Sequence, residues 1–171
     1  MARFAVWSSV LLSSIGIILI AVCLGTNNWV SRKRETFSVT EGLFFRCSWD
    51  VHSNNATHER CHRLYYNFKD FPALYIAILS LMFGACLFQL LTFLVSMLNF
   101  CMESSPAKAI CTLEILTFMC AVGGLSTYVR FYDNKYYRLD WSYIVGWVGV
   151  CFISIGLVFI IVGIERKRQS Y

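Results

Sequence analysis

The sequence predicts an all-α membrane fold, a four-helix transmembrane bundle with a small extracellular antiparallel β-sheet formed by the first loop. Three observations carry this prediction. The chain is strongly apolar, with 57% hydrophobic residues among 171 and only two prolines. Four long segments are almost free of charge. The loop between the first two segments contains two cysteines and a strand-like alternation of apolar and polar residues.

Each apolar segment is long enough to cross a membrane, which takes about 20 residues for a hydrocarbon core of about 30 Å. Such runs become helices because the backbone must satisfy its own hydrogen bonds in lipid. The predicted spans cover residues 4–26, 72–97, 107–129 and 141–164. The chain 1–171 is thus predicted to be a single four-span membrane domain, with extracellular loops at about 27–71 and 130–140. The first span is too long for a signal-peptide core and lacks a good cleavage site, so we expect it to be retained.

The first loop has the residue pattern of a small sheet. Residues 37–40 alternate apolar and polar side chains as a half-buried strand does. Gly42 interrupts the alternation, as a turn or bulge would. A second strand is expected over residues 43–49, and the segment 64–66 could pair back onto it. We therefore expect an antiparallel sheet on the outer face of the bundle.

Two of the eight cysteines, Cys47 and Cys61, lie in this loop. A disulfide between them would close a ring of about 15 residues, worth about 3 kcal/mol in the chain-entropy model. A glycosylation sequon at Asn55 lies between them. Because a disulfide persists in an oxidising compartment, we expect a multi-pass plasma-membrane protein with both termini cytosolic. Lys and Arg are more numerous in the loops placed outside, against the positive-inside rule, but we give the disulfide and the sequon more weight.

The remaining cysteines and the histidines have simpler interpretations. The five cysteines inside apolar segments are expected to be small buried hydrophobic residues. Cys101, at the inner end of the second span, is a candidate for palmitoylation. The loop histidines are interpreted as solvated rather than metal-binding; they are His52, His58 and His62. The sequence indicates no metal site and no cofactor.

Small residues predict the packing faces of the helices. Gly149, Gly156 and Gly163 recur every seven residues, with Gly146 one turn earlier, so they lie on one helix face. Helices in lipid associate through close contact of small residues. This face of the fourth span is therefore expected against the bundle or a partner helix. Similar strips occur on the first and second spans, at Ser9, Ser13 and Gly16, and at Ser80 and Gly84.

Glu114 is the one acidic residue inside a predicted span, where an exposed carboxyl is costly. We expect it to face the bundle interior and to pair with Gln89, which lies at a similar depth in the second span. The carboxyl would then be protonated or would share a water molecule. Two alternatives are that Glu114 snorkels towards Lys108, or that it forms an ion- or proton-linked site.

Several motifs resemble those of the claudin superfamily. They are Trp29 just past the first span, the step Gly42-Leu43-Phe44, and the two loop cysteines. The opening of the fourth span, WSYIVGWV at 141–148, is similar to the branch that holds peripheral myelin protein, the epithelial membrane proteins and the lens fibre membrane protein. This chain departs from the usual Leu-Trp step by carrying Phe44. We expect Trp29 and Phe44 to pack together and seat the sheet on the bundle.

No residue set typical of a catalytic site is present, and charges that could line a pore are missing from the spans apart from Glu114. We therefore expect a non-enzymatic tetraspan membrane protein that organises membranes or cell contacts through its sheet and helix faces. The resemblance implies two alternatives, an auxiliary regulatory subunit of an ion channel or receptor, or a trafficking and assembly factor. The expected partners are the lipid bilayer and other membrane proteins, by self-association or with a channel or receptor subunit; neither nucleic acid nor a small-molecule substrate is inferred.

Overall fold

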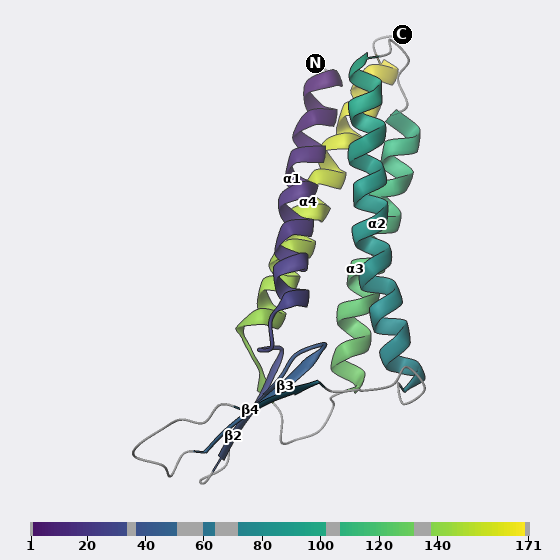
Figure 1. Cartoon of the computed structure of the whole chain (residues 1–171). Helices are drawn as coiled ribbons and strands as arrows, with labels where there is room; N and C mark the ends of the chain where they lie inside the picture. Colours follow the sequence, from purple (N-terminus) through teal and green to yellow (C-terminus); the bar gives the residue numbers. More distant parts are fainter. Residues whose placement is uncertain are drawn as a thin grey trace.

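Four long helices dominate the computed structural model, which describes residues 2–33, 37–50, 60–63, 72–101, 107–131 and 138–169 (Figure 1). The helices are α1 (Ala2–Gly25), α2 (Ala73–Cys101), α3 (Ala107–Phe131) and α4 (Trp141–Gln169). Each contains a stretch long and apolar enough to cross a membrane. The predicted four-helix membrane bundle is therefore confirmed.

Local chemistry sets where two of these helices begin. The carbonyl oxygen of Pro72 accepts the backbone N–H groups of Tyr75 and Ile76 at 2.9 and 3.2 Å, so α2 starts directly after it. Asp140 caps α4, because its Oδ1 accepts the backbone N–H of Trp141 at 2.8 Å. A carboxylate at this position satisfies an orphan donor and suits the positive end of the helix dipole.

The helices form two pairs. α1 packs mainly against α4, and α2 packs mainly against α3, with a smaller α3–α4 contact joining the pairs (Figure 1). Glycines allow the backbones of α1 and α4 to approach closely, since a Cβ on Gly16 would lie 2.6 Å from the carbonyl oxygen of Gly149. Close approach of small residues is the main attraction between helices in lipid. The chain termini lie at the end of the bundle away from the sheet.

The sheet has five antiparallel strands in the order β4-β3-β2-β1-β5. Their bounds are β1 Val30–Lys33, β2 Phe37–Glu41, β3 Phe45–Asp50, β4 Arg60–Arg63 and β5 Arg138–Leu139. The register places Cys47 opposite Cys61, and the two form a disulfide with a Cα–Cα distance of 4.1 Å. The predicted sheet and disulfide are therefore confirmed.

The sheet is larger than the sequence predicted. β1 begins immediately after Trp29 and pairs with both β2 and β5. β5 comes from the second loop, so the sheet is not formed by the first loop alone. The predicted interruption at Gly42 separates β2 from β3, whereas the segment 64–66 lies outside the described residues.

Candidate functional site

The carbonyl oxygen of Cys23, in the last turn of α1, joins the helix bundle to the sheet. The last carbonyls of a helix have no partner within the helix. Here the Cys23 oxygen accepts the indole Nε1–H of Trp29 at 2.6 Å, the hydroxyl of Thr26 at 2.9 Å and the hydroxyl of Ser142 at 3.3 Å. The hydroxyls of Thr26 and Ser142 also lie in direct contact, and because each carries one proton, Ser142 donates either to Thr26 or to the Cys23 oxygen. The end of α1, the start of β1 and the start of α4 are thereby tied to one atom.

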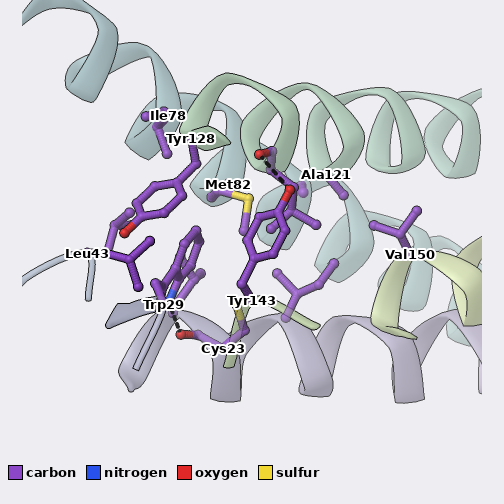
Figure 2. Close-up of a cluster of buried hydrophobic side chains, with 14 of the residues drawn as sticks. Cys23, Trp29, Leu43, Ile78, Met82, Ala121, Tyr128, Tyr143 and Val150 are labelled. Carbon is purple, nitrogen blue, oxygen red and sulfur yellow. Dashed lines mark hydrogen bonds between the residues drawn. The ribbon is translucent and has the colours of Figure 1, made fainter. Parts of the chain in front are cut away.

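The Trp29 side chain fills the space between the sheet and the helices, and none of it is exposed. Its ring meets Tyr128 of α3 edge-on, with centroids 4.4 Å apart, and lies 6.2 Å from the ring of Tyr143 of α4 (Figure 2). Edge-to-face pairs of this kind add about 0.5–1.5 kcal/mol beyond area burial. We call this cluster the seat; it consists of Cys23, Trp29, Leu43, Tyr128 and Tyr143.

The Gly42-Leu43-Phe44 step completes the seat. Leu43 is fully buried in the same core as Trp29, whereas Phe44 is 37% exposed. The residue of this step that joins the core around Trp29 is therefore Leu43, which points inward (Figure 2), while packing of Phe44 against Trp29 stays a prediction. Gly42 is required for close approach, since a Cβ there would lie 2.6 Å from the Cα of Asn27.

Backbone hydrogen bonds fix the sheet to the same junction. The N–H of Trp29 donates to the carbonyl of Glu41 at 3.2 Å, and the N–H of Asp140 donates to the carbonyl of Trp29 at 2.9 Å. The backbone of Trp29 therefore bridges β2 and the residue that precedes α4. Its ring packs against α3 and α4. The disulfide holds the outer strands β3 and β4 together. The result is a sheet whose position relative to the helices is fixed at several points.

The outer edge of the sheet is strongly basic. All four residues of β4 are exposed, and the strand carries Arg60, His62 and Arg63. His62 lies opposite Arg46 of β3, whose side chain is 51% exposed and pairs with the buried carboxylate of Glu41 at 2.9 Å. Within the described residues, β4 pairs with β3 on one side and with no strand on the other.

A second polar site lies inside the bundle, between the two helix pairs. The hydroxyl of Ser13 on α1 lies 2.6 Å from Oε1 of Glu114 on α3 and 2.8 Å from the carbonyl oxygen of Ser9, and its one proton goes to one of these two acceptors. The amide Nε2 of Gln89 on α2 donates to the Ser13 oxygen at 3.1 Å, and the Gln89 side chain also interacts with the Glu114 carboxyl. All three side chains are buried, with exposed fractions of 0–2%. We call these three residues the polar cluster.

Sequence reasoning placed Gln89 and Glu114 together but treated Ser13 only as a small packing residue. The structure brings all three side chains together and leaves none of the Glu114 carboxyl exposed, which does not fit the snorkelling alternative towards Lys108. The sequence feature that could have identified Ser13 is its hydroxyl group, which lies on the first span at the same depth as the buried acid Glu114.

The other predicted sites fall at several places. A Cβ on Gly146 would lie 3.0 Å from the sulfur of Cys23, and one on Gly156 would lie 2.9 Å from the backbone oxygen of Ser9. Gly149 meets Gly16, as described above, while Gly163 is half-buried. Cys101 is the last residue of α2. Asn55, His52 and His58 lie outside the described residues. No cluster of metal-binding side chains occurs among the residues that the structure describes.

A comparison with models of protein families identifies the family to which this chain belongs. The profile of the PMP-22/EMP/MP20/Claudin family matches residues 4–160, which include the seat, the disulfide, the first three spans and most of the fourth. The chain belongs to the PMP-22/EMP/MP20/Claudin family. This family consists of non-enzymatic tetraspan membrane proteins, and the match identifies no finer branch within it. A comparison with curated proteins finds no significant match.

The family match places the seat in a non-enzymatic tetraspan membrane protein. A tetraspan protein without catalytic groups acts through its surfaces, so the position of those surfaces matters. The seat determines the position of the sheet, and the exposed edge of the sheet is where a partner has access. The basic edge strand β4 is therefore the candidate functional site of this chain.

Proposed function

We propose that this chain organises membranes or cell contacts by presenting the edge strand β4 to other membrane proteins. The single observation that carries the proposal is the exposure of the whole β4 strand on a sheet that is fixed to the bundle. An unpaired strand edge offers a row of backbone hydrogen-bonding groups to another chain. A fixed platform binds with a smaller entropy cost than a flexible loop would.

The charge of the edge defines the kind of partner. Arg60 and His62 lie on the same face of the sheet as Arg46, because alternate residues of a strand share a face. The Glu41 carboxylate neutralises Arg46, which leaves the arginines of β4 as the main exposed charges of the described edge. An acidic surface on a partner protein would complement this edge and would speed association at low salt.

The proposed orientation places the sheet outside the cell and both termini in the cytosol. The Cys47–Cys61 disulfide supports this orientation, because such bonds persist in oxidising compartments. The first residues of α1 and the last of α4 lie at the opposite end of the bundle (Figure 1). Glycosidase treatment of protein from surface membranes tests the orientation. A mobility shift that is lost in Asn55→Gln supports it, whereas labelling of an Asn55→Cys variant by a membrane-impermeant maleimide supplied from the cytosolic side contradicts it.

An auxiliary subunit of a channel or receptor is the second candidate function, and the outer face of α2 is the surface that would dock on the helices of the partner. This face carries large exposed apolar side chains at helical spacing, namely Phe83, Leu87, Leu90, Leu94 and Leu98. Such a face serves equally as a lipid contact and as a docking strip for helices of another protein.

Purification of the tagged protein in mild detergent separates these functions. If the protein organises contacts, self-oligomers or junctional partners should be recovered with it. Replacing all three basic residues of β4 by Glu (Arg60, His62 and Arg63) should then abolish this recovery. The matched control is Arg138→Glu on the opposite edge of the sheet, which should leave recovery unchanged. Recovery of a channel subunit at fixed stoichiometry, insensitive to the β4 reversal and sensitive to Phe83→Ala, would contradict the first proposal and support the second.

A further inference from the structure

The polar cluster contains two buried oxygen atoms that lack a donor. Oε2 of Glu114 and Oε1 of Gln89 have no hydrogen-bond partner in the described structure. The other end of each group is already engaged at Ser13, at 2.6 Å for the carboxyl and 3.1 Å for the amide. An unsatisfied buried oxygen costs about 1–3 kcal/mol, and more when it is charged. Two such atoms on neighbouring planar groups therefore need an explanation.

A single proton on the carboxyl would satisfy both atoms. An ionised carboxylate only accepts hydrogen bonds, whereas a protonated one carries an O–H donor. With the proton on Oε2 and the Ser13 hydroxyl turned from the Ser9 carbonyl towards Glu114, Glu114 donates to Oε1 of Gln89, Nε2 of Gln89 donates to Ser13, and Ser13 donates to Oε1 of Glu114. The three groups then form a closed ring in which each donates one hydrogen bond and accepts one.

We propose that Glu114 is a proton-binding site, and that its bound proton closes a hydrogen-bonded ring that clasps the two helix pairs together. Ser13 belongs to the α1–α4 pair, whereas Gln89 and Glu114 belong to the α2–α3 pair. Direct packing between α1 and α2 is limited. The ring therefore crosses the boundary where the bundle has fewest other contacts.

The surroundings of the carboxyl supply no positive charge that could replace the proton. The side chains that interact with the carboxyl from other helices, Ser13 on α1 and Gln89 on α2, carry no charge. On its own helix, Cys111 is close enough to interact with it electrostatically. Lys108 is exposed at the end of α3. Removing the proton would leave Oε2 of Glu114 and Oε1 of Gln89 without a donor between them, so the ring should open as the pH rises.

Infrared spectroscopy of the purified protein in detergent micelles tests the bound proton directly. We expect the carbonyl stretch of a protonated carboxyl at neutral pH, and its disappearance in Glu114→Gln. The other nine acidic residues of the chain do not obscure the result, because the band is assigned to Glu114 by its loss in Glu114→Gln. Absence of a Glu114-dependent band at neutral pH would overturn the proposal.

Thermal stability at different pH values gives a second, independent test. Glu114→Gln replaces the O–H donor with an N–H donor, so its ring stays closed at every pH. We expect wild-type protein to lose stability between neutral and alkaline pH more than Glu114→Gln does, with both in a Cys111→Ala background so that ionisation of the neighbouring Cys111 thiol does not contribute. Glu114→Leu should be destabilised at neutral pH. If Glu114→Gln is as unstable as Glu114→Leu at neutral pH, the carboxyl is not acting as a neutral donor and the proposal is wrong.

Discussion

The role of Trp29 in holding the sheet gives the sharpest quantitative prediction. Its side chain is fully buried, donates a 2.6 Å hydrogen bond to the carbonyl of Cys23 and meets the ring of Tyr128. Truncating a buried aromatic residue to alanine costs about 3–5 kcal/mol. The lost indole hydrogen bond adds about 1 kcal/mol. Trp29→Ala should therefore remove about 4–6 kcal/mol, which is comparable to the whole stability of many domains.

Two matched variants separate the ring from its hydrogen bond. Trp29→Phe keeps an aromatic ring but loses the N–H, while Thr26 and Ser142 still satisfy the Cys23 carbonyl. We expect a loss of about 1–3 kcal/mol for Trp29→Phe, from the hydrogen bond and the smaller ring together. Trp141→Ala is the control, because that side chain is 46% exposed at the same end of the bundle.

Denaturant titration in mixed micelles would measure these differences, and a non-reducing gel would report the disulfide. We expect Trp29→Ala to reach the cell surface poorly and to show incomplete Cys47–Cys61 pairing, whereas Trp141→Ala behaves as wild type. If Trp29→Ala keeps its unfolding midpoint, surface delivery and disulfide, the seat does not hold the sheet and the reasoning is refuted.

Three further predictions concern packing, the disulfide and acylation. Gly156→Ala should destabilise the protein by about 1–3 kcal/mol in a thermal assay, through overpacking against α1. Gly84→Ala should be neutral in the same assay, because its new Cβ would have its nearest contact at 3.8 Å. Equal effects of the two substitutions would contradict the close α1–α4 contact. Cys47→Ser should cost about 3 kcal/mol and reduce surface delivery, whereas Cys151→Ser, on an exposed face of α4, should do neither. Cys101→Ser should abolish metabolic palmitate labelling, and persistent labelling would place the acyl group elsewhere.

The sequence predicted the parts of the fold that depend on local patterns. Long apolar runs specify spanning helices by themselves, because lipid leaves the backbone no other partner. The alternation around residue 39 and the two loop cysteines likewise predicted strands β2 and β3 and the disulfide. β5 was missed because it has two residues, too few to produce a periodic pattern. Its pairing with β1 is a long-range contact that local sequence does not encode.

The candidate site was predicted less completely, for similar reasons. The seat depends on Tyr128 and Tyr143, which read as ordinary aromatic residues near helix ends. Which residue of the pair Leu43 and Phe44 turns inward depends on the turn at Gly42, so hydrophobicity could not decide between them. The buried acid was recognisable because it is costly in lipid, but its hydroxyl partner Ser13 resembled the small residues used for packing.

The central claim is that the fixed sheet presents β4 to a partner, and site-specific photo-crosslinking in intact membranes tests it most directly. A photo-reactive amino acid would replace His62 on β4, with Leu139 on β5 as the control, since both side chains are exposed but lie at opposite edges of the sheet. The account predicts an adduct of defined mass from position 62 that is much weaker from position 139. No adduct at position 62, or equal adducts at both positions, would contradict the claim that this edge is the contact surface.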